Sequence, residues 1–246
     1  MLFILLKHFL EVIRLTCEKW EPIATFILAL ATILLFFATI ILALVALFQD
    51  RLRTFVFSPS IDLEPGPFYP DYEKVPVTNK MTKQVITQAC CLGIRIRNCG
   101  PSSAEKVEVF IAKIEKESNG VFCKVSGFYA LNLTWRHYDP PVVFLERLLP
   151  DTARECALGS IVDPNQKHKV GADHSSLNLP ANRSPFQLAL ATIPNTRSDL
   201  LAPGKYRLFL EIGSANARRV KKRTVELEFT GEWLAETDKM AVARLV

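Results

Sequence analysis

The sequence has little of the material from which metal and cofactor sites are usually built. It contains four histidines, and none of its six cysteines forms a CxxC pair. It also lacks GxSxG, HExxH, GxxxxGK[ST] and GxGxxG, the spacings of common hydrolase, zinc, P-loop and dinucleotide sites. We therefore predict no catalytic residues, no metal ligands and no cofactor.

The cysteines also lack the pattern of a disulfide framework. Cys90 and Cys91 are adjacent, so on a strand their side chains would point to opposite faces. Five of the six cysteines lie after residue 53. Because unpaired cysteines are typical of reducing compartments, they favour a cytoplasmic position for this part of the chain.

Excess charge of one sign is small. The formal net charge is +5, and residues 1–53 hold five basic and four acidic residues, which leaves about +4 for the rest. A nucleic-acid-binding domain would concentrate basic charge on one face. We therefore predict no nucleic-acid partner.

Apolar residues are abundant but unevenly distributed. Residues 23–48 contain no charged side chain, and this run exceeds the roughly 20 residues that cross a bilayer as a helix. The apolar part of a cleaved signal peptide is shorter, about 7–15 residues. We predict an uncleaved transmembrane helix with its juxtamembrane segment at residues 22–53. The protein would be a single-pass membrane protein, of the inner membrane if it is bacterial.

The first twenty residues have an amphipathic pattern. Their charged residues Lys7, Glu11, Arg14 and Glu18 fall on one narrow stripe of a helix, and apolar residues fill the rest. Residues 1–20 are predicted to form an amphipathic helix that lies in the membrane interface. The alternative is the first helix of a packed oligomer.

After residue 53 the pattern becomes alternating, which is typical of strands. We predict a mainly β fold, a β-sandwich over residues 54–236, with residues 237–246 as a tail. Residues 65–76 are expected to form a proline-rich loop and residues 163–184 a long surface loop. The strands are expected at 55–64, 84–98, 107–115, 121–129, 131–137, 142–149, 153–162, 185–193, 205–213 and 223–233.

The stretch IRNCGPSSAEKVEV, residues 96–109, is predicted to be a corner between two strands. Asn98 and Gly100 tolerate positive φ, and Pro101 fixes a turn. The stretch resembles the corner of bacterial immunoglobulin-like modules of the CARDB type, and LAPGKYRLFL at residues 201–210 resembles their late strand. The resemblance implies an immunoglobulin-like β-sandwich that acts as a binding or spacer unit without catalysis.

Two groups of residues are candidate binding sites. Trp135, His137 and Tyr138 precede a double proline and could anchor a protein partner, although such aromatics also fill β-sandwich cores. The second group is a basic run that could contact anionic lipid headgroups or an acidic partner, or could be a solvated hairpin. It consists of Arg218, Arg219, Lys221, Lys222 and Arg223.

Two weaker candidates involve metal or thiol chemistry. His168, Asp173 and His174 share the long loop, but their spacing matches no standard ligand set, so solvated loop residues are favoured. Cys99 could be a reactive thiol near Arg95 and Arg97, but we favour a buried or partly buried structural cysteine.

These patterns together predict a membrane-anchored, non-catalytic binding or scaffold module. Its partners would be the lipid bilayer and an unidentified protein. One alternative is a membrane-bound enzyme with a site on the loop at 163–184. The other is a membrane-perturbing effector, in which residues 1–48 assemble under the control of the sandwich. Arg51 and Arg53 lie closest to the bilayer edge and favour a cytoplasmic sandwich, although the three basic residues before the span favour the opposite orientation.

Overall fold

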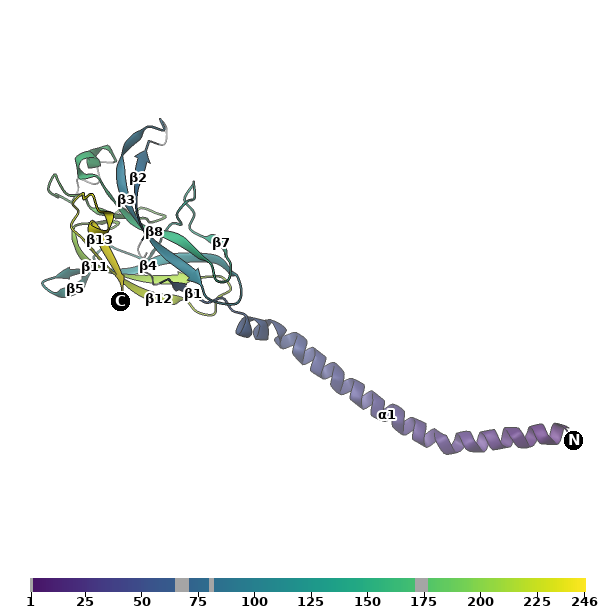
Figure 1. Cartoon of the computed structure of the whole chain (residues 1–246). Helices are drawn as coiled ribbons and strands as arrows, with labels where there is room; N and C mark the ends of the chain where they lie inside the picture. Colours follow the sequence, from purple (N-terminus) through teal and green to yellow (C-terminus); the bar gives the residue numbers. More distant parts are fainter. Residues whose placement is uncertain (1, 65–70, 80–81, 171–176) are drawn as a thin grey trace. The chain divides into compact units, whose positions relative to one another are not determined.

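The computed structural model describes residues 2–64, 71–79, 82–170 and 177–246. The chain divides into two compact units, Met1–Val56 and Phe57–Val246. The first unit is helical and the second is built of strands (Figure 1).

The first unit is a single helix, α1, which runs from Leu2 to Val56. Its stretch Pro22–Gln49 has 28 residues and is long and apolar enough to cross a membrane. Within this stretch Thr32 and Thr39 donate their hydroxyls to the carbonyls of Leu28 and Leu35, at 2.8 and 2.7 Å. These polar groups are therefore paired inside the helix itself.

The sequence pattern predicted two helices, at residues 1–20 and from residue 22, but the structure has one. Pro22, the first residue of the predicted second helix, lies inside α1. A proline there removes one backbone hydrogen bond and its ring clashes with the carbonyl four residues earlier, which kinks a helix without ending it. Figure 1 shows that α1 is bent along its length. An interfacial position for residues 1–20 stays a prediction.

The second unit contains two antiparallel sheets. The first sheet has the order β1-β3-β8-β9-β10, with β2 also paired to β3. Its strands are β1 (Ile61–Leu63), β2 (Asp71–Thr78), β3 (Val85–Asn98), β8 (Ala153–Val162), β9 (Phe186–Leu188) and β10 (Leu200–Leu201).

The second sheet has the order β13-β12-β11-β4-β5, and β6 and β7 also pair with β4. Its strands are β4 (Ala104–Ser118), β5 (Val121–Lys124), β6 (Leu131–Asn132), β7 (Leu145–Leu148), β11 (Gly204–Gly213), β12 (Lys221–Phe229) and β13 (Ala241–Leu245). The 3₁₀ helices η1 (Pro164–Lys169) and η3 (Thr237–Lys239) lie in the connections. The structure confirms the predicted mainly β fold.

Both sheets contribute to one hydrophobic core. In β3, Ile94 and Ile96 are fully buried while Arg95 and Arg97 point outward, as the alternation predicted. In the second sheet Ile111 of β4 and Leu208 of β11 lie in the same core cluster as those isoleucines. The core therefore holds the two sheets together, and each sheet turns its other face outward.

A short segment crosses from one sheet to the other. Asn132 pairs with Phe110 of β4, and three residues later Trp135 bridges to Cys156 of β8. This crossing brings the Trp135 side chain into the core, where it is 2 % exposed.

The corner between β3 and β4 is organised by the side chain of Asn98. Its amide nitrogen donates to the carbonyls of Ser102 and Leu148, at 2.7 and 3.1 Å, and its oxygen accepts from the backbone N–H groups of Gly100 and Ser60, at 3.0 and 3.3 Å. The side chain is fully buried, so these four bonds replace contacts with water.

The predicted corner is present, but its glycine acts differently from expectation. Neither Asn98 nor Gly100 has positive φ. A Cβ at Gly100 would lie 2.3 Å from the backbone nitrogen of Ser60 and 2.8 Å from Pro59. Gly100 is needed because the chain entering β1 passes too close for any side chain.

Several element boundaries differ from the predictions. The helix continues to Val56, so the strand expected at residues 55–64 is reduced to β1. Part of the expected loop at 65–76 is strand β2, and residues 65–70 lie outside the described residues. The expected tail at 237–246 contains η3 and β13, which pairs with β12 along its whole length.

Candidate functional site

The basic run is divided between a loop and a strand. Arg218 and Arg219 are exposed in the loop between β11 and β12, whereas the three later residues begin β12. Arg223 donates two hydrogen bonds to Asp62 of β1, at 2.8 and 2.6 Å, and Lys221 lies 3.1 Å from the same carboxylate. These residues tie the two sheets together.

The electrostatics of Asp62 reflect this pairing. Burial raises the pKa of the Asp62 carboxyl, but the hydrogen bonds from Arg223, Lys221 and the backbone of Leu63 lower it more, so it lies below its usual range. The same contact with Asp62 raises the pKa of Arg223. Part of the basic run therefore serves the fold.

The aromatic group is also divided. Trp135 is in the core, and its indole nitrogen donates to the carbonyl of Val143 at 3.0 Å. His137 and Tyr138 are exposed in the following loop, and His137 Nε2 lies 3.4 Å from a carboxylate oxygen of Glu155. Only His137 and Tyr138 of this group are available to a partner.

The sequence reasoning missed Arg136, which lies between Trp135 and His137. The Arg136 side chain is only 9 % exposed and forms ion pairs with Glu73 of β2 and Glu155 of β8. It crosses the outer face of the first sheet above Gly93, where a Cβ would lie 3.1 Å from Arg136 Nη1. An isolated glycine inside a strand pattern is a signal of such close approach.

The long loop at 163–184 is partly structured. Asp163 caps η1, and Lys167 joins η1 to the returning chain by donating to the carbonyls of Pro180 and Arg183. His168 is exposed at the end of η1, and Asp173 and His174 lie outside the described residues. In the described part of the chain, no group of three or more histidine, cysteine, aspartate or glutamate side chains could hold a metal ion.

The five cysteines after residue 53 are free thiols that differ in burial, and Cys91 is intermediate. Cys90 and Cys156 are buried, and burial raises the pKa of the Cys90 thiol to about 11. Cys99 and Cys123 are exposed. The expectation that Cys99 is at least partly buried was therefore wrong, because its side chain points out of the corner that Asn98 holds together.

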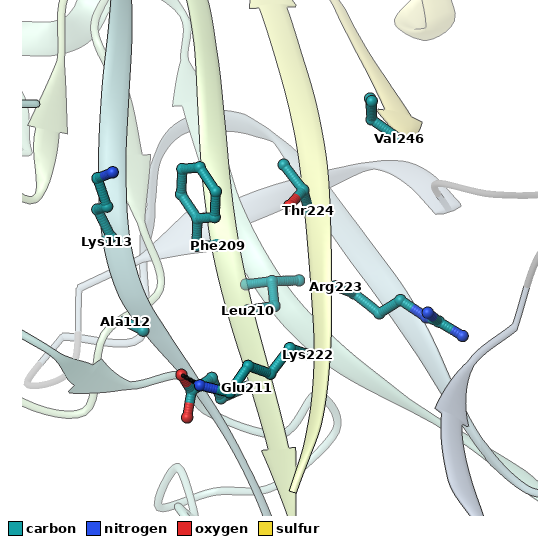
Figure 2. Close-up of a pocket in the computed structure, with 9 residues that line it drawn as sticks. All are labelled: Ala112, Lys113, Phe209, Leu210, Glu211, Lys222, Arg223, Thr224 and Val246. Carbon is teal, nitrogen blue, oxygen red and sulfur yellow. Dashed lines mark ion pairs between the residues drawn. The ribbon is translucent and has the colours of Figure 1, made fainter. Parts of the chain in front are cut away.

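The outer face of the second sheet contains a groove of about 420 Å³. Figure 2 shows its residues on three adjacent strands, with Lys113 on β4, Phe209 on β11 and Thr224 on β12 side by side. Val246, 67 % exposed, lines the groove from the end of the chain beyond β13. Ala112, Leu210, Glu211, Lys222 and Arg223 complete the lining.

The groove combines an aromatic ring with charges. Lys113 Nζ lies 4.9 Å from the centre of the half-buried Phe209 ring, within cation–π distance. Glu211 and Lys222 form a 3.0 Å ion pair across the neighbouring strands. The polar side chains of the lining are those of two lysines, an arginine, a glutamate and a threonine.

Two residues of the predicted basic run, Lys222 and Arg223, thus belong to the groove, while the aromatic group does not. The signal for Phe209 was present in the sequence, because alternation in residues 205–213 places it on the outer face among charged residues. What no periodicity could show is that β4 lies beside β11.

Comparison with known proteins adds no relative. No protein-family model matches the chain, and no curated protein matches it.

Proposed function

We propose that this chain is a membrane-anchored, non-catalytic binding module. The α1 stretch Pro22–Gln49 would be the anchor, and the unit Phe57–Val246 would be an immunoglobulin-like β-sandwich that recognises a protein partner. The observation that carries the proposal is the groove on the outer face of β4, β11 and β12.

Strand order supports the immunoglobulin-like assignment. The neighbours β1-β3-β8 and β5-β4-β11-β12 correspond to the A-B-E and C′-C-F-G arrangements of that architecture. A second support is Tyr206, near the start of β11, whose hydroxyl donates to the carbonyl of Ala202 at 2.6 Å. A tyrosine bonded to the backbone a few residues upstream at this corner is a hallmark of such sandwiches.

The partner is inferred from the groove's chemistry. Phe209 offers an apolar ring, and the paired charges of Lys113, Glu211 and Lys222 surround it. A protein segment that places an apolar side chain on Phe209 and exchanges ion pairs with these charges would match it.

We further propose that the sandwich lies in the cytoplasm. Arg51 and Arg53 follow the apolar stretch directly, and cytoplasmic flanks are enriched in basic residues. The free thiols of the β unit suit a reducing compartment.

Site-specific photo-crosslinking in cells tests the groove. A photoreactive amino acid in place of Thr224 should give a discrete crosslinked product, and one in place of Ser160, on the first sheet, should not. Phe209→Ala should reduce that product about tenfold, because a central aromatic contact contributes roughly 1–2 kcal/mol or more to binding.

The matched control is Tyr129→Ala, which removes an exposed aromatic residue (53 %) that does not line the groove. It should leave the crosslink unchanged. Equal products from the Thr224 and Ser160 positions, or no effect of Phe209→Ala, would exclude the groove as the binding site.

A further inference from the structure

Four chain segments meet at one end of the β unit, which we call the entry end: residues 57–60, 99–103, 149–152 and 214–220. Asn98 bonds to Ser60 in the first, to Gly100 and Ser102 in the second, and through its backbone to Thr152 in the third. The fourth is joined by Asn216, whose amide nitrogen donates to the carbonyl of Ser103 at 2.9 Å. The entry end is therefore one hydrogen-bonded surface.

The exposed residues of the entry end are apolar and basic. Phe57, Leu149 and Val220 are 58, 52 and 48 % exposed. Arg218 and Arg219 are exposed beside Val220, and Asp151 is the only acidic residue in the four segments. Large apolar side chains next to arginines are the composition of surfaces that lie in a membrane interface.

Chain length places this end close to a bilayer that α1 spans. Only residues 50–56 separate the apolar stretch, which ends at Gln49, from Phe57 at the start of the β unit. As a helix, seven residues extend about 10 Å, and even fully extended they reach only about 25 Å.

We propose that the entry end docks on an anionic lipid leaflet, with Arg218 and Arg219 at the headgroups and Val220, Leu149 and Phe57 at the interface. This inference rests on the membrane anchor of the proposed function and names the lipid that Arg218 and Arg219 recognise. β4 runs away from the entry end, from Ala104 to Ser118, so docking leaves the middle of the second sheet free for a partner.

Two native thiols provide a matched pair of probes. Cys99 is exposed at the entry end, and Cys123 is exposed on β5, opposite Lys116 near the far end of β4. The two ends are roughly 40 Å apart along the strand. The full chain, with Cys17→Ser and one of the two exposed cysteines changed to serine, would be labelled with a fluorophore and placed in nanodiscs.

The measurement is quenching of the fluorophore by a nitroxide-bearing lipid. With about 30 % phosphatidylserine, quenching at Cys99 should be about threefold or more stronger than in pure phosphatidylcholine. Salt of about 0.5 M should remove this difference, because it screens the charges. Quenching at Cys123 should stay low in both lipids. Arg218→Glu with Arg219→Glu should abolish the effect of phosphatidylserine, and Lys124→Glu at the far end should not.

The outcomes separate the docking from the anchor. Chain that incorporates into nanodiscs and resists carbonate extraction, yet shows equal quenching at both thiols or no dependence on the two arginines, would overturn the docking alone. Quenching at Cys99 that is the same in both lipids would also overturn the docking, because residues 50–56 alone would then explain why Cys99 lies near the bilayer. Failure to incorporate would overturn both the anchor and the docking.

Discussion

At the scale of single residues, Asn98 is the side chain on which the entry end most depends. Its amide satisfies two carbonyls and two N–H groups from four different residues, and all of these bonds lie in or beside the core. A side chain that could not both donate and accept would leave some of these groups without a partner, which is costly where water cannot replace it.

Asn98→Ala should therefore lower the free energy of unfolding by about 2–4 kcal/mol. Urea denaturation of the detergent-solubilised chain, followed by the fluorescence of buried Trp135, would measure this. Asn182→Ala, at an exposed position, is the control and should change stability by less than about 0.5 kcal/mol. A loss of the same small size for Asn98→Ala would show that the corner does not depend on the amide.

Residue types predicted the existence of this corner but not its mechanism. Asn98 and Gly100 were expected for their tolerance of positive φ, which is a local property. The structure uses the Asn98 amide and the absence of a Gly100 Cβ against segments about 40 and 50 positions away in sequence. Such long-range contacts leave no local signal.

At the scale of elements, β11 joins the core to the groove. Tyr206 and Leu208 face inward, and Phe209 and Glu211 face the groove on the other side. The hydrogen bond from Tyr206 to Ala202 holds the turn from β10 into β11, so it fixes the position at which this alternation starts.

Tyr206→Phe keeps the ring but removes the hydroxyl, and the partly buried carbonyl of Ala202 loses its donor. The variant should be less stable by about 1–2 kcal/mol in the same urea titration. Tyr129→Phe removes the hydroxyl of an exposed tyrosine and serves as the control. If both variants lose equally little stability, the Tyr206 hydroxyl does not hold the turn, and Tyr206 contributes only its ring to the core.

The positions of the long strands were predicted well. The expected strands at 84–98, 153–162 and 205–213 match β3, β8 and β11 within one residue, whereas β4 extends three residues beyond the expected 107–115 at each end. β2 was missed because prolines around and within it suggested a loop, and an edge strand tolerates proline. The tail was missed because β13 is stabilised by pairing with β12, which is a tertiary contact.

At the scale of the whole molecule, the apolar stretch of α1 and the β unit were both evident from composition, since one lacks charge and the other alternates. The candidate site was only partly evident. Lys222 and Arg223 were singled out for their charge, while their structural pairing with Glu211 and Asp62 depends on strand neighbours that no single-segment pattern encodes.

The side of the membrane on which the β unit lies can be read from Cys123. This thiol is exposed on β5, far from the entry end, so lipid docking would not shield it. Cys90, Cys91 and Cys156 should react slowly, because burial raises the pKa of each of these thiols and limits access to them.

In a Cys17→Ser, Cys99→Ser background, a membrane-impermeant maleimide should label lysed cells but not intact ones. Adding Cys123→Ser should remove the fast signal, and denaturant should then reveal the slow thiols. Labelling of intact cells would place the β unit outside and reverse the proposed orientation.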